Sequence, residues 1–303
     1  MNHETNRRGA LKCLGLGAGT LFTLSGGVLN AISLDAARAQ PLSGTPLFVQ
    51  LSDTHIGFNK EANPDVAGTL NAAIDRVNAL PVQPPLILHT GDVTHLSRAA
   101  EFDQAQQLMS RLKVTDLHFV PGEHDVTDGP GTEFFNRFGA PSKGLGYYSF
   151  DANGVHFVAL NNVMHFKPGG LSSLGDDQLA WLKADLAARP SSQPIVIFAH
   201  MPLWDIYAPW GWGCADAQPL ADMLRPFGSV TVLCGHIHQI VSKVEGNVTF
   251  HTARALAYPQ PAPGSAPAPG PMKVPADQLR SLLGVSSVSL SGTALTITDT
   301  NLS

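Results

Sequence analysis

The sequence contains few charged residues, and basic residues in particular are scarce. Asp, Glu, Lys and Arg make up 14% of its 303 residues, against roughly a quarter in an average soluble protein. Acidic residues outnumber basic ones by 24 to 19. A protein that coats long nucleic acid needs a basic face to replace the counterions, so we expect no long nucleic acid as a partner. The balance does not exclude a small anionic substrate, because bound metal ions can supply positive charge locally.

Cysteine is also scarce, and long apolar runs are missing from most of the chain. Cys13 lies near the N-terminus, and only Cys214 and Cys234 lie in the body of the sequence. These two could pair in an oxidising compartment. Their connectivity cannot be deduced from sequence, and we expect two unpaired thiols. After residue 40 no stretch is long and apolar enough to span a bilayer, so we expect no stable membrane anchor there.

The first 39 residues have the pattern of a twin-arginine signal peptide. Arg7-Arg8 is followed by a Gly-rich apolar stretch over Leu14–Leu34 and by the small-x-small sequence Ala37-Arg38-Ala39. We expect the twin-arginine machinery to export the folded protein to the periplasm, with cleavage after about Ala39. The apolar stretch is nearly long enough to span a membrane, so an uncleaved N-terminal anchor is the alternative. Without this segment the chain keeps 15 basic and 22 acidic residues.

Short apolar runs alternate with helix-like stretches along the rest of the chain. Strands are expected at Leu47–Leu51, Leu86–His89, Leu117–Val120, Tyr147–Phe150, Val155–Leu160, Ile195–Ala199, Val230–Cys234, Gln239–Val244 and Val248–Thr252. Helices are expected at Asp65–Leu80, Ala99–Leu112, Asp176–Ala188 and near Gln218–Arg225. This alternation indicates βαβ units around sheets that are covered by helices, so the predicted fold class is α/β.

Potential metal ligands follow five of the predicted buried strands. They occur in Asp53-Thr54-His55, in Gly91-Asp92, in Gly122-Glu123-His124-Asp125, at His200 and in Gly235-His236-Ile237-His238. The carboxyl ends of strands in open α/β sheets are where ligands bind, so we expect these side chains to converge. One such pair would be an ordinary polar strand end, but five in order are a specific signal. Carboxylate and imidazole ligands without thiolate suit zinc, manganese or iron.

These motifs resemble the pattern of the calcineurin-like metallophosphoesterase superfamily, which combines Asp-x-His, Gly-Asp, Gly-Asn-His-Asp/Glu, a lone His and Gly-His-x-His. The match covers about residues 47–252. The resemblance implies a four-layer α/β/β/α sandwich built from two βαβ-type halves, with two metal ions at its top. It also implies a catalytic domain over residues 40–258. Some bacterial members resemble cyclic-nucleotide phosphodiesterases.

The resemblance also implies a role for each matched residue. Asp53, His55 and His238 would bind the first metal ion, and Asp92 would bridge both ions. The second ion would be bound by His200, His236 and the residue at the position of Glu123.

Three further residues are candidates for catalysis. His124 would stabilise the transferring phosphoryl group or protonate the leaving oxygen, and Asp125 would orient His124. His95 stands three residues after Asp92, where relatives place a metal-binding Tyr or a substrate-facing His. His95 is therefore a candidate phosphate contact or extra ligand, with an ordinary loop histidine as the alternative.

Glu123 departs from the family pattern, which usually has Asn at this position. Glutamate adds a third carboxylate to Asp53 and Asp92. This could weaken the metal pair as a Lewis acid, or it could favour a trivalent ion in one site. We expect Glu123 to be a ligand because hard cations prefer carboxylate, while a side chain turned toward a nearby Arg or Lys is the alternative.

Several other segments carry weaker signals. The loop Trp204–Trp212 holds three of the four tryptophans, and it could be an aromatic wall for a flat substrate group or a loop packed on the domain. Residues 259–275 are Pro-rich and predict an extended loop. Strands are expected to follow at Val285–Leu290 and Ala294–Thr298, so that residues 259–303 pack on the same domain. His89, His118 and His156 lie within strands and are expected to be structural, whereas His251 and Arg254 could approach the site or be exposed.

The sequence therefore predicts a dinuclear-metal hydrolase that uses a metal-activated water. The expected substrate is a small or nucleotide-like phosphodiester, and the expected ions are two of Fe, Mn or Zn. A phosphomonoesterase is one alternative. A second alternative is a metal-binding sensor or binding protein that has lost turnover, because Glu123 departs from the family pattern.

Overall fold

The computed structural model describes residues 20–25, 28–33, 45–142, 145–167 and 169–303. The chain divides into two units, Met1–Pro41 and Leu42–Ser303. In the first unit β1 (Thr20–Ser25) pairs antiparallel with β2 (Val28–Ser33). Arg7-Arg8 and the expected cleavage sequence lie outside the described residues, so the signal peptide stays a prediction. Among the described helices, none has the length and apolar character needed to cross a membrane.

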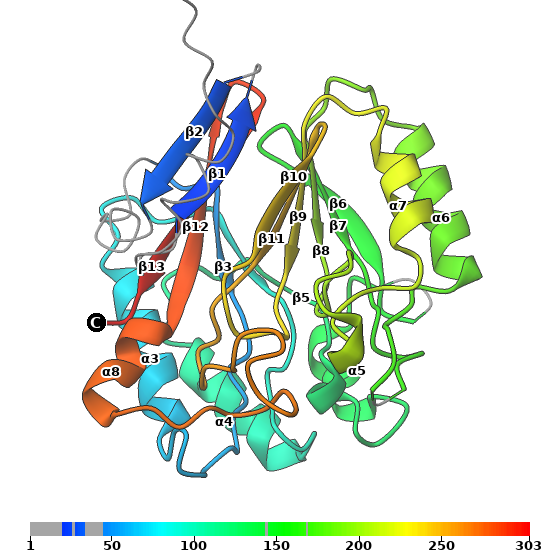
Figure 1. Ribbon diagram of the computed structural model, residues 1–303. Coiled ribbons are helices and arrows are strands. Elements are labelled where there is room, and N and C mark those ends of the chain that lie inside the picture. Colours follow the sequence, from blue (N-terminus) through cyan, green and yellow to red (C-terminus); the bar gives the residue numbers. More distant parts are fainter. Residues whose placement is uncertain (1–19, 26–27, 34–44, 143–144, 168) are drawn as a thin grey trace, which may run out of the picture. The chain divides into compact units, whose positions relative to one another are not determined.

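The second unit contains two mixed β-sheets (Figure 1). The five-stranded sheet has the order β13-β12-β3-β4-β5, in which β3, β4 and β5 are parallel. Its strands are β3 (Phe48–Leu51), β4 (Leu86–His89), β5 (Leu117–Phe119), β12 (Gly284–Ser291) and β13 (Ala294–Asn301). Because β12 pairs antiparallel with β3, the C-terminal strands belong to this sheet.

The six-stranded sheet has the order β10-β11-β9-β8-β7-β6. Its strands are β6 (Tyr148–Ala152), β7 (Val155–Ala159), β8 (Ile195–Phe198), β9 (Val230–Cys234), β10 (Ser242–Glu245) and β11 (Val248–Thr252). Strands β7, β8, β9 and β11 are parallel, and β6 and β10 are antiparallel edge strands. The parallel strands of both sheets therefore bring their carboxyl ends, and the loops that follow, to one edge of each sheet.

Three hydrophobic clusters form the interfaces of a four-layer α/β/β/α sandwich. Along β8, Ile195 and Ile197 face the cluster beneath α6 and α7, whereas Val196 and Phe198 face the cluster between the sheets. Side chains of a strand alternate between its two faces, so an uninterrupted apolar run predicts a strand that is buried on both. The outer helices are α3 (Val66–Asn78), α4 (Ala99–Met109), α6 (Asp176–Ala187) and α7 (Ala217–Leu224).

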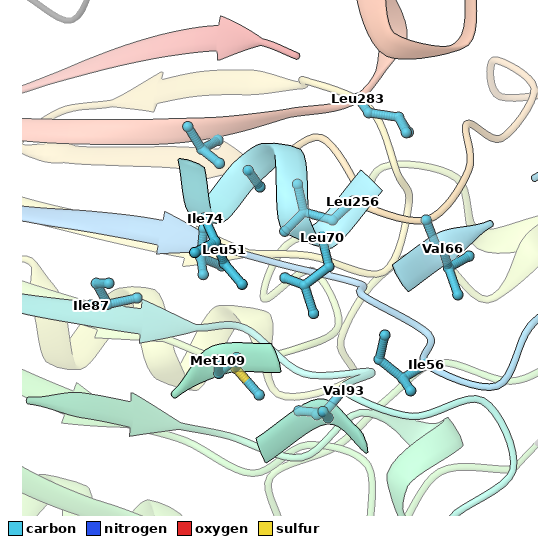
Figure 2. Close-up of a cluster of buried hydrophobic side chains, with 14 of the residues drawn as sticks. Leu51, Ile56, Val66, Leu70, Ile74, Ile87, Val93, Met109, Leu256 and Leu283 are labelled. Atoms are coloured by element: carbon cyan, nitrogen blue, oxygen red, sulfur yellow. The ribbon is translucent and has the colours of Figure 1, made fainter. Parts of the chain in front are cut away.

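Helix α3 shows why the outer layer is stable. Asp65 caps its first turn by accepting a hydrogen bond from the Gly68 amide. Figure 2 shows Leu70 and Ile74 of this helix in the same cluster as Leu51 and Ile87 of the strands. Complete burial of one such side chain contributes about 1.5 to 3 kcal/mol.

The strands and the longer helices of the second unit agree with the sequence prediction to within a few residues, whereas β1 and β2 of the first unit were not predicted. Two short helices, α5 (Thr132–Phe138) and α8 (Ala276–Leu282), were not predicted. Each has only seven residues, too few for a helical period to stand out. Cys214 and Cys234 are free and buried, as expected.

Candidate metal centre

The predicted ligands lie at the carboxyl ends of β3, β4, β8 and β9 and in the loop after β5, where the sheets face each other. Seven non-glycine residues in the described part of the chain have positive φ, and five of them are predicted ligands: Asp53, His55, Asp92, His236 and His238. Such backbone strain costs of order 1–3 kcal/mol per residue and concentrates at functional sites. The strain is therefore an independent sign that this edge is built for a purpose other than stability.

One cluster of three ligand atoms comes from Asp53, His55 and His238. His238 Nε2 lies 3.3 Å from Asp53 Oδ1 and 3.3 Å from His55 Nε2. Asp92 stands at its edge, because its Oδ2 is 3.4 Å from His55 Nε2 and also 3.4 Å from His200 Nε2. One carboxylate oxygen thus faces both halves of the centre, as the bridging role predicted for Asp92 requires.

The other cluster comes from Glu123, His200 and His236. Glu123 Oε2 lies 2.8 Å from His200 Nε2, and Glu123 Oε1 lies 2.9 Å from His236 Nδ1. Glu123 therefore points into the centre, and the alternative in which it turns toward an Arg or Lys is wrong.

The residues of this second cluster fit a metal ion. Glu123 Oε2, His200 Nε2 and His236 Nδ1 are buried, and none of them has a hydrogen-bond partner among the described residues. Their close approaches lack the angles of a hydrogen bond. Buried polar atoms are nearly always satisfied, and a cation bound between the carboxylate and the two imidazoles would satisfy all three.

Backbone carbonyls fix the orientation of two ligand histidines. His200 Nδ1 donates to the Thr90 carbonyl at 2.7 Å, and His238 Nδ1 donates to the Tyr258 carbonyl at 2.6 Å. In each ring the proton is held at Nδ1, which leaves Nε2 with a lone pair directed at the centre. This second layer of hydrogen bonds is a common feature of metal sites.

Two motif glycines are required because the ligand loops approach each other closely. A Cβ at Gly122 would overlap the Asp92 carboxylate, and a Cβ at Gly235 would overlap Ser52 Oγ. The His236 amide also donates to Asp53 Oδ1 at 3.1 Å. The loops of the two sheets are thus locked together at the centre.

His124 and His95 lie beside the ligands. Their rings are stacked with centroids 4.8 Å apart, and His124 Nδ1 donates to the His95 carbonyl at 2.7 Å. The His124 amide donates to Asp92 Oδ1 at 2.9 Å, and His95 Nδ1 lies 3.4 Å from His55 Nδ1. His95 is therefore next to a predicted ligand and is not an isolated loop residue.

Asp125 has a different task from the predicted one. Its carboxylate accepts hydrogen bonds from the amides of Gly122, Val93 and Thr94 and from Thr94 Oγ1. It braces the two ligand loops, while the His95 carbonyl orients His124. The prediction that Asp125 orients His124 is wrong, because both oxygens of the carboxylate accept hydrogen bonds from backbone amides instead. Burial and the charge of Asp92 raise the pKa of Asp125 to about 7.

The electrostatics of the centre favour ionised carboxylates. Burial opposes the ionisation of Asp53 and Glu123, but neighbouring imidazoles outweigh it. His238 holds the pKa of Asp53 down at about 2, and His236 and His200 hold the pKa of Glu123 well below its usual value. Burial likewise opposes protonation of His124, but Asp92 and Glu123 outweigh it and raise its pKa. Burial and His124 lower the pKa of His95 to about 4.

Tyr258 is a site residue that the sequence analysis missed. Its Oη lies 3.3 Å from His55 Nε2, and its ring stacks on His55 with centroids 4.9 Å apart. It follows β11, outside every metal-ligand motif, so no spacing rule could have found it.

A cleft of about 530 Å³ opens above the centre. Its floor includes His55, Asp92, Glu123, His236 and His238, and its sides include Phe58, Lys60, His95, His124, Trp210, Trp212, Tyr258, Gln260 and residues 267–271. The aromatic loop is packed on the domain in one part and lines the cleft in another. Trp204 is buried against Phe250 in the core, whereas Trp210 lines the cleft.

The remaining polar candidates lie elsewhere. His89 and His156 are buried in strands, as expected for structural residues. His251 is buried too, where it contacts Ser242 and Asp299, so it neither reaches the centre nor is exposed. Arg254 donates to the carbonyls of Ser281 and Leu282 near the end of α8.

Comparison with known proteins agrees with this geometry. The probable cyclic nucleotide phosphodiesterase RPA0124 of Rhodopseudomonas palustris is 27% identical over 222 residues, which cover 70% of this chain and 78% of that protein. The serine/threonine-protein phosphatase CPPED1 of Mus musculus is 27% identical over 257 residues, 76% of this chain and 81% of that protein. A dimetal phosphatase from Danio rerio has the same fold, with a TM-score of 0.65 at 15% identity over 85% of this chain and 97% of that one. A family model described as calcineurin-like phosphoesterase matches residues 46–240. The chain therefore belongs to the calcineurin-like phosphoesterase family and is a phosphoric ester hydrolase.

Proposed function

We propose that the chain is a dinuclear-metal phosphodiesterase that hydrolyses diesters with small or nucleotide-like groups. The observation that carries the proposal is the pair of ligand clusters that share Asp92, at the floor of a mostly apolar cleft. The relative from Rhodopseudomonas palustris, named a probable cyclic nucleotide phosphodiesterase, adds support for a diester substrate.

Asp53, His55 and His238 would hold one ion, Glu123, His200 and His236 the other, and Asp92 would bridge them. When bound, a pair of Fe, Mn or Zn ions clamps the phosphate and activates a water. Hydrolysis then forms a bond from a water oxygen to phosphorus and breaks the bond to the leaving oxygen, which takes up a proton.

The chain's own residues supply that proton and hold the phosphate. His124 keeps Nδ1 on the His95 carbonyl, so Nε2 is the atom that exchanges a proton with the leaving oxygen. If His55 binds through Nε2, its Nδ1 carries a proton and donates to His95 Nδ1, 3.4 Å away. His95 would then be protonated at Nε2 and would donate to a phosphate oxygen in the cleft.

The charge of the centre reduces the advantage that a doubly charged monoester would have over a diester. Asp53, Asp92 and Glu123 place three carboxylates in the centre. Among the described residues that line the cleft, Lys60 is the only lysine or arginine. Three carboxylates cancel most of the positive charge that two divalent ions would bring. A diester carries one negative charge and a free monoester carries up to two, so the site gains less from the second charge of a monoester than a site with two carboxylates would.

The test compares 4-nitrophenyl phosphate with bis(4-nitrophenyl) phosphate on protein loaded with Mn²⁺, Zn²⁺ or Fe. We expect a higher kcat/KM for the diester with at least one metal. A higher value for the monoester would favour the phosphatase alternative, which the similarity to CPPED1 supports. Metal binding without hydrolysis of either substrate would favour a sensor or binding protein.

We also propose that the protein is exported to the periplasm by the twin-arginine route, as the N-terminal sequence indicates. Cell fractionation of the full chain tests this. The double substitution Arg7→Lys and Arg8→Lys should retain the protein in the cytoplasm, and unchanged export would contradict the proposal.

A further inference from the structure

Two loops line one part of the cleft, here called the slot. One wall is the 3₁₀ turn Ala208–Trp210, with Trp210 facing the cleft. The other is the Pro-rich segment, which contributes Pro267, Ala268, Pro269, Gly270 and Pro271. This second wall lies beyond residue 240, where the match to the family model ends. It is therefore a feature that the family motifs do not explain.

The Pro-rich wall is tied to the metal centre through Gln260. The Gln260 side chain donates to the His236 carbonyl at 2.8 Å and accepts from the Gly270 amide at 3.0 Å. At its far end, Lys273 forms an ion pair of 2.9 Å with Glu61. The segment is thus held over the ligand loop at one end and against the first sheet's loops at the other.

The wall that contains Trp210 is also held in place. The Trp210 ring makes edge contacts with Tyr207 and Trp212, whose centroids lie 5.3 Å and 4.9 Å away. The two walls approach each other where a Cβ at Gly264 would lie 3.1 Å from Tyr207 Oη. Both sides of the slot are therefore set before a ligand enters, which lowers the entropy lost on binding.

The chemical groups of the two walls determine which parts of a substrate can bind in the slot. Pro267, Pro269 and Pro271 have no N–H to donate, and the Gly270 amide is already bound to Gln260. The proline rings and the Trp210 indole offer mainly apolar surface, on which the hydroxyl groups of a glycerol ester gain little. A flat apolar ring has no such hydroxyl groups, and stacking of a ring on an aromatic side chain contributes about 1 to 3 kcal/mol.

We propose that the slot lined by Trp210 and residues 267–271 binds one ester group of the substrate as a flat ring, while the phosphate lies against the predicted metal ligands. This inference rests on the proposed function for the phosphate position. It assigns to Trp210 and the Pro-rich segment the choice between aromatic and aliphatic esters. It also makes glycerol-like diesters poor substrates.

The test uses two diesters with the same leaving group, phenyl 4-nitrophenyl phosphate and ethyl 4-nitrophenyl phosphate. Wild-type protein should prefer the phenyl ester in kcat/KM by about tenfold or more. Trp210→Ala should reduce that preference by about fivefold to a hundredfold, the equivalent of one stacking contact. Pro269→Ser, in the Pro-rich wall, should reduce it in the same direction. Trp181→Ala is the matched control, because Trp181 packs on Tyr147, outside the cleft.

A binding measurement separates this inference from the proposed function. Metal-loaded protein should bind phenylphosphonate more tightly than methylphosphonate by calorimetry, and Trp210→Ala should remove the difference. Selective binding without hydrolysis would overturn the proposed function and keep the slot. Hydrolysis of both diesters with equal kcat/KM would contradict the binding of a ring in the slot and leave the proposed function standing. Phosphonate binding that Trp210→Ala leaves unchanged would do the same.

Discussion

Two buried histidines lie at opposite ends of one strand pair and have opposite environments. His156 of β7 is paired with Ile195, the first residue of β8, and His200 lies two residues after Phe198, the last residue of β8. Both side chains are fully buried and both face carboxylates. His156 hydrogen-bonds to Asp151 at 3.0 Å and to Asp185 at 2.6 Å. His200 approaches Glu123 to 2.8 Å, yet its Nε2 has no hydrogen bond to any described residue.

The difference separates a structural histidine from a metal ligand. At the His156 end the carboxylates satisfy both ring nitrogens, so the pair is complete without a further group. At the His200 end a carboxylate and two imidazoles present unsatisfied atoms to a common point. Buried polar groups left in that state are costly unless a ligand completes them. The first four predictions act on the His200 end, and the last acts on the His156 end.

The largest effect is expected from Asp92→Asn. Asp92 Oδ2 faces His55 and His200 equally, so loss of its charge weakens both ion sites. Even residues that only orient ligands cost 10–100-fold when changed. We expect kcat/KM to fall by more than about a thousandfold and metal content to drop, while circular dichroism stays native. A variant with two ions and near-normal turnover would show that Asp92 does not bridge.

Substitution of His124 by Asn separates proton transfer from metal binding at the same end. His124 lies beside Asp92 and is not one of the predicted ligands, although it forms a further group of possible ligand atoms with Asp92 and Glu123. Both ions should remain, and kcat should fall by about a hundredfold if His124 is a general acid. The loss should shrink for esters with good leaving groups, which need less protonation. Equal losses across a leaving-group series would point to charge stabilisation instead.

Removal of the metal ions should lower the stability of the fold, because the bound ions stabilise the end of the sheets where His200 lies. A ligand at a hundred times its Kd stabilises the folded state by about 2.7 kcal/mol, which corresponds to roughly 5 to 10 °C in Tm for a chain of this size. We expect EDTA to lower the Tm of the wild type by that amount. The metal-poor Asp92→Asn variant is the control and should respond little. An identical shift in both proteins would mean that the chelator acts elsewhere.

The metal ligands could be predicted from the sequence because their motifs occur at regular places along the chain. Each motif follows a buried apolar strand, and the parallel arrangement brings such ends together. It could not show that His251 is buried beside Asp299 or that Asp125 binds three backbone amides. These contacts join segments that are far apart in sequence and have no periodic signal.

The residues that line the cleft also could not be predicted from the sequence alone. The composition of residues 259–275 predicted an extended loop, and the segment is irregular apart from turns. That it passes over the metal centre depends on Gln260 and Lys273, whose partners are His236 and Glu61. Neither partner is implied by local sequence. Tyr258 belongs to this group too, since only the packed structure places its ring against His55.

Glu123→Asn changes the carboxylate that distinguishes the His200 end from the family pattern. Two divalent ions bring four positive charges, and the carboxylates of Asp53, Asp92 and Glu123 contribute three negative charges. An Fe³⁺ beside a divalent ion would restore the balance of a site with two carboxylates, and a carboxylate and imidazole shell suits that ion. We therefore predict iron in the native site. The variant should shift toward two divalent ions, by about tenfold in relative affinity.

Elemental analysis with Mössbauer or EPR spectroscopy on both proteins checks the iron prediction. Glu123→Gln is the matched control, because it removes the charge and keeps the side-chain length. It should shift in the same direction as Glu123→Asn. Fully active native protein with two divalent ions and no iron would contradict the prediction.

The smallest effect is expected at the His156 end, from Asp185→Asn. Burial raises the pKa of Asp185, but hydrogen bonds from His156 and Ser149 outweigh it, so the folded pKa lies below its ordinary value. Burial also opposes the ionisation of Asp151, but hydrogen bonds from Arg189 and His156 outweigh it and lower its pKa. The stability that these carboxylates contribute is present above an unfolded pKa of about 3.9 and is lost as pH falls through the folded pKa.

Asp185→Asn should lower the free energy of unfolding at pH 7 by about 1 kcal/mol. It should also flatten the loss of stability between about pH 5 and pH 2, because one of the two titrating carboxylates is gone. Activity and metal content should not change, since the pair lies at the far end of β8 from the centre. Asp222→Asn is the control: its carboxylate is exposed and paired with Arg225, so its effect should stay within about 0.5 kcal/mol. Urea unfolding at a series of pH values measures both variants. If Asp185→Asn instead removed metal or activity, the two ends of the strand would not be independent, and the distinction between the two histidines would fail.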